Sequence, residues 1–177
     1  MIQRIQTLLL VLAAGLNVAV LFLPLGAAFD TDSMEGATVE LYGSSMKMSK
    51  FDEENAFVLD NPFIEETMGA GENTMLLVHV ILIVATSLFL LFVIFLFNNR
   101  GRQLRMAYAG IVMLMIQAVV AALLFMQLPD LIGDVNELRH DIAYGFFFPV
   151  GSILLTLFAA RRIRHDENLV KSSDRIR

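Results

Sequence analysis

The sequence predicts an all-α membrane protein, a four-transmembrane-helix bundle with a large, partly β first outer loop. Three observations predict this class. Hydrophobic residues make up 56% of the 177 residues, against 18% charged, with a mean hydropathy of +0.65. The apolar residues gather in four long runs, and none of these runs contains Asp, Glu, Lys or Arg. A soluble domain of this length does not require such a composition.

The four runs set the positions of the expected spans in a single membrane domain, 1–177. The spans are expected at about 8–28, 75–97, 106–128 and 142–160. Each run is close to the ~20 residues that cross a hydrocarbon core of ~30 Å as a helix. Because hydrocarbon offers no hydrogen-bond partners, the backbone of each run must pair internally, as it does in a helix.

Charged residues are distributed unevenly over the connecting segments. The N-terminus, the loop 98–105 and the tail 161–177 together hold ten Lys or Arg and three acidic residues. The loops 29–74 and 129–141 hold three basic and fifteen acidic residues. The positive-inside rule then predicts a multi-pass protein of the bacterial inner membrane, with both termini and 98–105 in the cytoplasm and the two acidic loops outside. The polar tail is expected to be a frayed helix or to lack fixed structure.

The first run also has features of a removable export signal. Arg4 precedes the apolar run, and Gly26-Ala27-Ala28 at its end resembles a cleavage site. However, the apolar stretch from Leu8 through Leu23 exceeds the ~7–15 residues of a usual signal core. Asn17 also interrupts this stretch, so we expect a retained first span.

The opening heptapeptide, "MIQRIQT", runs directly into an apolar helix. In this feature and in its hydropathy along the whole chain, the sequence resembles a bacterial family of small four-span integral membrane proteins of unknown function. The resemblance implies membrane location and the topology given above. It implies no activity and no functional residues. Members are sometimes labelled transcription termination factors, but the sequence has no phosphate-binding loop of the G-x-x-x-x-G-K-[ST] type, so we expect no nucleic-acid partner.

The layout also resembles that of claudin-type proteins, in which a large first outer loop forms a small sheet. In "ATVELYG" (37–43), Val39 and Leu41 alternate with polar residues, and "AFVLD" (56–60) is a short apolar run. Alternation with a period of two is typical of half-buried strands, so two or three short strands are expected in 29–74. The Trp and paired Cys of claudins are absent, and the likeness therefore concerns layout alone.

Polar residues within the spans are the candidate site residues, because an unpartnered polar group in lipid is costly. Asn17 and Gln117 both fall near mid-depth, where a hydrogen bond between them would fix helix packing. His79 lies about one turn into the second span, and Ser152 lies in the fourth. These four residues serve either helix packing or the lining of a cavity. Pro149 in "YGFFFPVGS" removes a helix hydrogen bond and is a candidate kink.

Several function classes are disfavoured by what the spans lack. They contain no carboxylate for ion-coupled transport, and no nucleophile, base and acid gather as in an enzyme. Without Cys, and with no recognisable ligand spacing, we expect no cofactor and no metal site. The sequence predicts a non-catalytic accessory or scaffold subunit, whose partners are the lipid bilayer and other membrane subunits or further copies of itself. The alternative is a small-molecule or lipid carrier with a cavity between the helices.

Overall fold

The computed structural model describes residues 3–30, 38–51, 63–69, 73–128 and 138–174. The chain divides into two compact units. The helical unit comprises Met1–Ala19, Leu82–Ala118 and Phe147–Arg177, and the sheet unit comprises Val20–Ile81 and Val119–Phe146. Each unit is therefore assembled from segments that lie far apart in the sequence.

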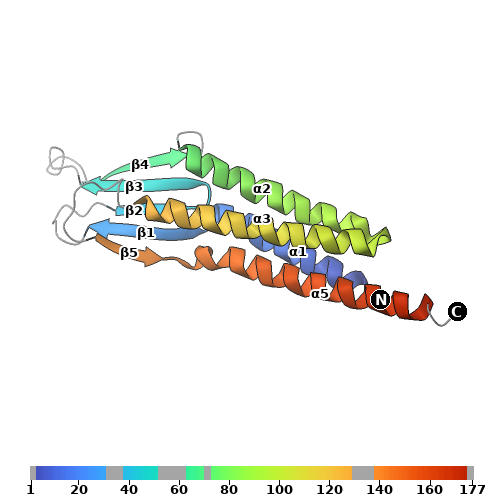
Figure 1. The fold of residues 1–177 in the computed structure, drawn as a ribbon. Coiled ribbons are helices and arrows are strands. Elements are labelled where there is room, and N and C mark those ends of the chain that lie inside the picture. The colour runs from blue at the N-terminus through green and yellow to red at the C-terminus, as the bar shows by residue number, and fades with distance from the viewer. Residues whose placement is uncertain (1–2, 31–37, 52–62, 70–72, 129–137, 175–177) are drawn as a thin grey trace. The chain divides into compact units, whose positions relative to one another are not determined.

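Four helices in the described residues are long and apolar enough to cross a membrane. In Figure 1 they are labelled α1 (Gln3–Ala19), α2 (Thr74–Phe95), α3 (Arg100–Met126) and α5 (Phe148–Asp174). Short 3₁₀ segments continue or precede three of them: η1 (Val20–Phe22) follows α1, η2 (Leu96–Asn98) follows α2, and η3 (Tyr144–Phe147) precedes α5. The predicted number of long apolar helices is confirmed, while their boundaries differ from the prediction.

Two asparagines fix where α2 and α3 begin. The Asn73 side-chain oxygen accepts hydrogen bonds from the backbone N–H groups of Met75 and Leu76, at 2.9 and 3.2 Å. The Asn99 side-chain oxygen accepts one from the N–H of Arg102, at 3.1 Å. Each asparagine thus satisfies backbone donors that the first helical turn leaves without partners.

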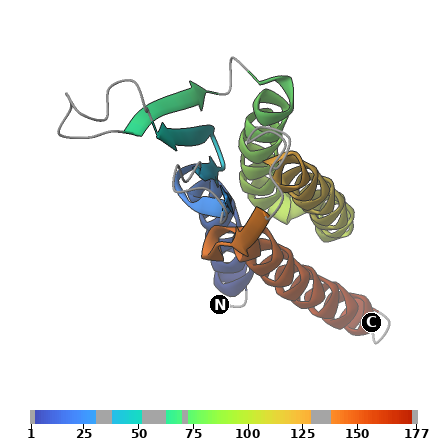
Figure 2. The same cartoon turned by 90° about the vertical axis from the view of Figure 1, so that its left-hand side faces the viewer.

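The core of the helical unit is built where α1 packs along α5. Ala13 and Ala14 of α1 are buried in the same cluster as Ala159 and Ala160 of α5. Figures 1 and 2 show these two helices side by side. Small side chains let two helix backbones approach closely, which is how helices associate when lipid removes the hydrophobic driving force.

Helices α2 and α3 also approach closely within the helical unit. A Cβ atom added to Gly110 would lie 2.8 Å from Cδ2 of Leu90, a buried core side chain. Leu114, one turn further along α3, is buried in the same cluster. Gly110 therefore lies where the Leu90 side chain of α2 packs against α3.

The sheet unit contains a five-stranded antiparallel sheet with the strand order β4-β3-β2-β1-β5. Its strands are β1 (Pro24–Asp30), β2 (Thr38–Tyr42), β3 (Ser45–Phe51), β4 (Phe63–Gly69) and β5 (Leu138–Ile142). The first four precede α2, and the fifth follows α3, so the last strand joins the sheet beside the first one.

The alternation in β2 separates an apolar face from a polar face. Val39 and Leu41 are fully buried, whereas Glu40 between them is exposed. The strand that the sequence predicts at 37–43 is thereby confirmed. The second expected strand, at 56–60, lies outside the described residues.

The first predicted span, 8–28, is wrong at its C-terminal end. The helix stops at Phe22, and β1 begins at Pro24. Proline has no N–H to donate and disfavours helical geometry in the residue before it, which ends the helix although the sequence stays apolar. The stretch Gly26-Ala27-Ala28 then pairs with β2 on one side and with β5 on the other. A cut at this signal-like stretch would divide an inner strand of the sheet.

The other predicted spans also differ from the observed helices at their ends. Helix α3 begins at Arg100, so most of the predicted loop 98–105 is helical, and the predicted start of the fourth span, Ile142, belongs to β5. Helix α5 continues to Asp174, which corrects the expectation of a frayed tail after residue 160. Two strands were not predicted at their positions: Leu138–Ile142, at the end of the predicted outer loop 129–141, and Phe63–Gly69, in the partly β loop 29–74. Each is a strand because a neighbouring strand supplies its backbone partners.

Replacing Gly43 by Ala is expected to destabilise the sheet unit. A Cβ atom at this position would lie 2.0 Å from the carbonyl oxygen of Val20 and 3.0 Å from Cα of Leu21, both of which are backbone atoms. Relieving such overlap typically costs about 1–3 kcal/mol. Thermal unfolding of the full chain in detergent should show a lowered midpoint for Gly43→Ala. Gly69→Ala, whose added Cβ atom meets nothing within 4 Å, is the matched control, and equal midpoints for the two variants would contradict the expectation.

Candidate functional site

A buried polar cluster joins three helices inside the helical unit. Asn17 of α1 donates from Nδ2 to Oγ of Ser87 at 3.0 Å and to the carbonyl oxygen of Ile83 at 3.2 Å, both on α2. Gln117 of α3 donates from Nε2 to Oδ1 of Asn17 at 2.9 Å. Asn17 and Gln117 are both fully buried. The structure thus places between them the hydrogen bond that the sequence suggests.

Ser87 explains how α2 takes part in this cluster. Its hydroxyl donates to the carbonyl oxygen of Ile83 one turn earlier, at 2.8 Å, which leaves its oxygen free to accept from Asn17. Sequence reasoning did not select Ser87. The signal was available, because Ser87 stands near the middle of an uncharged span, as Asn17 and Gln117 do.

Ser152 does not join the cluster through any hydrogen bond between described residues. Its hydroxyl donates to the carbonyl oxygen of Phe148 at 3.1 Å, and its own carbonyl accepts from the Thr156 hydroxyl at 2.8 Å. Both bonds connect residues one turn apart within α5. Ser152 and Thr156 are thus buried polar residues whose hydroxyls bond to backbone carbonyl oxygens of their own helix.

Pro149 lies in the first turn of α5. It is the second residue of α5, directly after the 3₁₀ segment η3. In the first turn of a helix, the missing N–H of proline removes no hydrogen bond that the helix would otherwise make. The kink at Pro149 stays a prediction for the junction of η3 and α5.

His79 lies in the sheet unit, where it connects α2 to the turn between β2 and β3. Its Nδ1 is 3.2 Å from the carbonyl oxygen of Gly43. The side chain is fully buried, and Nε2 has no hydrogen-bond partner among the described residues. In the described part of the chain no three His, Asp or Glu side chains gather as metal ligands would.

A second polar cluster, which sequence reasoning missed, connects the ends of three helices in the helical unit. The side-chain amide of Gln6 in α1 donates to a carboxylate oxygen of Asp166 in α5. Arg100, the first residue of α3, donates from Nη1 to the backbone carbonyl oxygen of Asp166 at 3.1 Å. Gln6 and Asp166 are each about 95% buried, although both belong to polar segments of the sequence.

Helical spacing could have revealed this cluster. Asp166 follows Ala159 and Ile163 at intervals of four and three residues, so it continues the buried stripe of α5. Gln6 precedes Leu10 and Ala13 on the buried stripe of α1 in the same way. Polarity alone predicts a frayed tail, but polarity does not show which face of a continuing helix is covered.

The polar face of the sheet carries a row of residues from all five strands. The register places Asp141, Ala27, Glu40, Lys47 and Thr67 side by side across β5, β1, β2, β3 and β4. The four polar members of the row are exposed. A basic and an acidic residue are adjacent at Glu40 and Lys47, and neutral Ala27 separates Glu40 from Asp141.

A hollow of about 230 Å³ opens on this polar face, with Glu40, Tyr42 and Asp141 among its lining residues. The Tyr42 hydroxyl donates to the Glu40 carboxylate at 3.1 Å, and the Lys47 ammonium lies 5.2 Å from the centre of the Tyr42 ring. The hydrogen bond to Glu40 is the main reason that the pKa of Tyr42 is raised above its ordinary value of 10.0. The hydroxyl thus keeps its proton and remains a hydrogen-bond donor at neutral pH.

A family model described as a domain of unknown function, DUF4293, matches residues 2–176. No curated protein matches the chain.

Removing the Asn17 side chain is expected to destabilise the helical unit and to reveal coupling with Gln117. In Asn17→Ala, Ser87 and Gln117 each lose a partner in a buried site. A double-mutant cycle with Gln117→Ala should give a coupling of about 0.6 kcal/mol, a typical value for such pairs between membrane helices. The measurement is chemical unfolding of the full chain in detergent. In the matched cycle of Asn17→Ala with Ser152→Ala the coupling should be near zero, and equal couplings in the two cycles would show that the Asn17–Gln117 bond has no special role.

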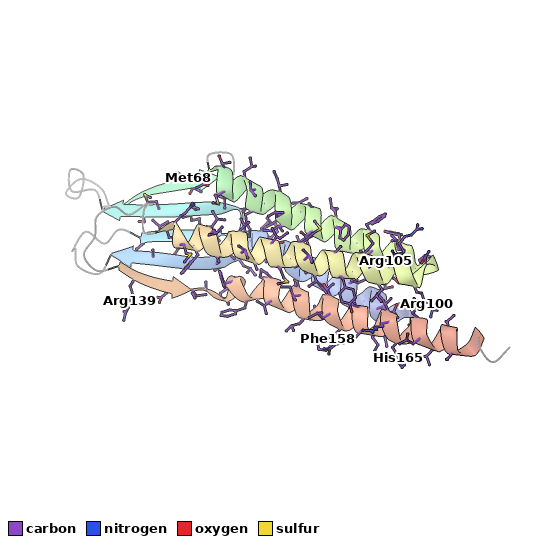
Figure 3. All side chains as sticks on the ribbon, viewed as in Figure 1. Met68, Arg100, Arg105, Arg139, Phe158 and His165 are labelled. Atoms are coloured by element: carbon purple, nitrogen blue, oxygen red, sulfur yellow. The ribbon has the colours of Figure 1, made fainter. Side chains whose placement is uncertain are left out.

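Replacing Asp166 is expected to lower stability, although the residue lies beyond the apolar stretch of α5. Asp166→Ala leaves the buried Gln6 amide without its partner, and an unsatisfied buried donor costs about 1–3 kcal/mol. Asp166→Asn retains an acceptor for this amide and should lose less stability. The neighbouring His165 is exposed and points away from the helices (Figure 3), so His165→Ala is the control in the same unfolding assay. A loss for His165→Ala as large as that for Asp166→Ala would contradict the assignment.

Proposed function

We propose that this chain, which belongs to the DUF4293 family, is a non-catalytic integral membrane protein that acts as an accessory or scaffold subunit of a larger membrane assembly. One observation carries the proposal. Asn17, Ser87 and Gln117, near the middle of the helices, bond to one another in buried positions, while Oε1 of Gln117 and Oγ1 of Thr86 have no hydrogen-bond partner among the described residues. A carrier needs these polar groups to face a cavity that its cargo enters. A scaffold instead needs them bonded to one another inside the protein.

The location that we propose is the bacterial inner membrane, with both termini in the cytoplasm. The four helices are long and apolar enough to cross a bilayer, and the uneven distribution of Lys and Arg supports this orientation. The sheet would then form outside the cytoplasm, from the segments before α2 and after α3. This order of helices and strands also supports the likeness to the claudin-type layout.

The lipid bilayer is the first partner in this proposal. The surfaces of the four helices carry large exposed apolar side chains, such as Leu88, Phe95 and Phe158. Arginines near the polar ends of α3 and α5 would lie at the cytoplasmic headgroups: Arg100, Arg102, Arg105, Arg161, Arg162 and Arg164. Each would attract anionic lipid by ~1 kcal/mol.

Other membrane subunits are the second class of partner, and the polar face of the sheet is the surface that we propose for them. Its exposed row of charged residues in a fixed register offers directional contacts. Such contacts favour specificity between partners, since like charges placed opposite one another are rejected.

Affinity purification of the tagged full chain in mild detergent tests this function. We expect a stoichiometric membrane complex, and its recovery should fall when Glu40→Lys reverses one charge of the exposed row. Ser172→Ala, an exposed change near the end of α5, should leave recovery unchanged. Recovery of a single chain with a tightly held lipid or small molecule would support the carrier alternative and overturn the scaffold.

A further inference from the structure

A buried histidine of the sheet unit has one ring nitrogen without a partner. His79 is fully buried, and its Nδ1 lies 3.2 Å from the carbonyl oxygen of Gly43. Because a carbonyl oxygen can only accept a hydrogen bond, Nδ1 carries the proton, and Nε2 of the neutral ring keeps a free lone pair. Nε2 has no hydrogen-bond partner among the described residues. A buried lone pair in this position favours a ligand that can meet it.

Histidines that bind metals are held in the same way. When one ring nitrogen binds a metal, the other usually donates to a carboxylate or a backbone carbonyl, which fixes the tautomer and the direction of the ring. The turn between β2 and β3 supplies such a carbonyl at Gly43. This turn is itself tightly placed, since a Cβ atom at Gly43 would lie only 2.0 Å from the carbonyl oxygen of Val20. The lone pair of Nε2 is therefore oriented before any ligand binds.

Three methionines lie on the elements next to His79. Met46 of β3 and Met68 of β4 stand directly opposite each other in the sheet, where Cβ atoms are typically about 4.5–5.5 Å apart. Figure 3 shows Met68 near the point where α2 begins. Met75 precedes His79 by four residues on α2, so their side chains lie on the same face of the helix. All four residues belong to the sheet unit.

Two of these methionines lie at the same level along the unit. Met46 stands opposite Leu41, which precedes Gly43 by two residues, or about 7 Å along a strand. Met75 is about 6 Å from His79 along the axis of α2. Figure 1 shows α2 starting beside the sheet and running away from it, so both methionines are displaced in the same direction from the contact of His79 with Gly43. Since Met68 is opposite Met46, the thioethers gather within about one helical turn of the imidazole.

The strand also removes a charge that the sequence places among these sulfurs. Lys47 stands between Met46 and Met48 in the sequence, where its ammonium would oppose a bound cation. Side chains alternate along a strand, so Lys47 lies on the polar face, 5.2 Å from the centre of the Tyr42 ring. Met46 lies on the opposite face and is buried. The sheet therefore separates the ammonium from the thioethers.

The donor atoms favour a soft, singly charged metal ion. Thioethers are uncharged and polarizable, and soft sulfur ligands select Cu(I). Zn²⁺ is bound instead by thiolates, imidazoles and carboxylates. The chain has no Cys, and in the described residues no three His, Asp or Glu side chains gather as such a site would require.

We propose that the sheet unit binds one Cu(I) ion through Nε2 of His79 and the thioether sulfurs of Met46, Met68 and Met75. Met68 and Met75 are only partly buried, so the ion can reach these ligands from the surface. The binding step involves no change of oxidation state. This metal site goes beyond the proposed scaffold function and does not depend on it.

Competition for Cu(I) tests the site. The full chain, purified in detergent with a tag that contains no histidine, is titrated into the coloured Cu(I) complex of bicinchoninate, with a reductant and without oxygen. We expect the chain to withdraw one equivalent of Cu(I). Met46→Leu and Met75→Leu should each weaken binding by about tenfold or more, in the range that losing a group of a metal site typically costs. A chain that withdraws no Cu(I) would overturn the proposal.

Met48→Leu is the matched control. Met48 lies on the same strand and the same face as Met46, but two residues further from the β2–β3 turn, and this variant should bind Cu(I) as the unchanged chain does. Leucine is close to methionine in volume and is well tolerated in cores, and the unfolding midpoint without metal checks that each variant keeps its fold. Equal losses of affinity for Met46→Leu and Met48→Leu would refute the proposed ligands.

Two further measurements identify the donor atoms. X-ray absorption at the copper edge should show sulfur neighbours and one imidazole, and a spectrum without sulfur would overturn the site. Ag⁺, a soft ion that does not change oxidation state here, should raise the unfolding midpoint, because a ligand that binds only the folded chain stabilises it. Zn²⁺ should not raise it, and an equal rise with both ions would contradict the thioether ligands.

These outcomes are distinct from those of the purification described above. A stoichiometric membrane complex that binds no Cu(I) would retain the scaffold and reject the metal site. A single chain that holds a tightly bound lipid and also binds one Cu(I) would retain the metal site and reject the scaffold.

Discussion

Polar amides inside apolar helices must find partners within the protein, and this requirement determines how α1 sits among its neighbours. Asn17 meets it by bonding to α2 through Ser87 and to α3 through Gln117. Because an unpaired buried amide is costly, a rotation of α1 that broke these bonds would be penalised even where the apolar contacts are nearly equivalent. Apolar packing thus brings the helices together, and the amides select one arrangement.

A second amide side chain, that of Gln6, fixes the other end of the same face of α1. Gln6 stands eleven residues before Asn17, which is close to three full turns, so both amides project from one side of α1. Gln6 bonds to Asp166, and the alanines Ala13 and Ala14 between the two amides allow α5 to lie close. Helix α1 is therefore held by hydrogen bonds at two levels, with Leu10, Ala13 and Ala14 buried between them.

The sequence predicts the helices of this protein better than their ends. Four uncharged runs suffice to predict four spans, because insertion into lipid depends on composition. The ends depend on hydrogen bonding, which composition does not record. The apolar residues after Pro24 became a strand because β2 and β5 provide partners on both sides. The polar tail remained helical because Asp166 lies on a covered face.

The hydrogen bonds of the candidate site likewise include one that the sequence predicts and one that it does not. Asn17 and Gln117 could be paired from their depth in the spans, because two amides at the same level in lipid have few other partners. The Gln6–Asp166 contact could not be predicted from depth, since both residues lie in polar segments where water was the expected partner. Its prediction requires following the buried stripes of α1 and α5 by helical spacing into these polar segments.

The sheet is completed only after most of the chain has been made. Strands β1 to β4 precede α2, and β5, which covers the free side of β1, follows α3. The β1–β5 pairing joins residues more than one hundred positions apart, as in Ala28 opposite His140. Such pairing is slow, because the chain must order a long loop before the contact stabilises it. Helices α2 and α3 lie within that loop, so part of its length is ordered by helix formation and not by the β1–β5 contact.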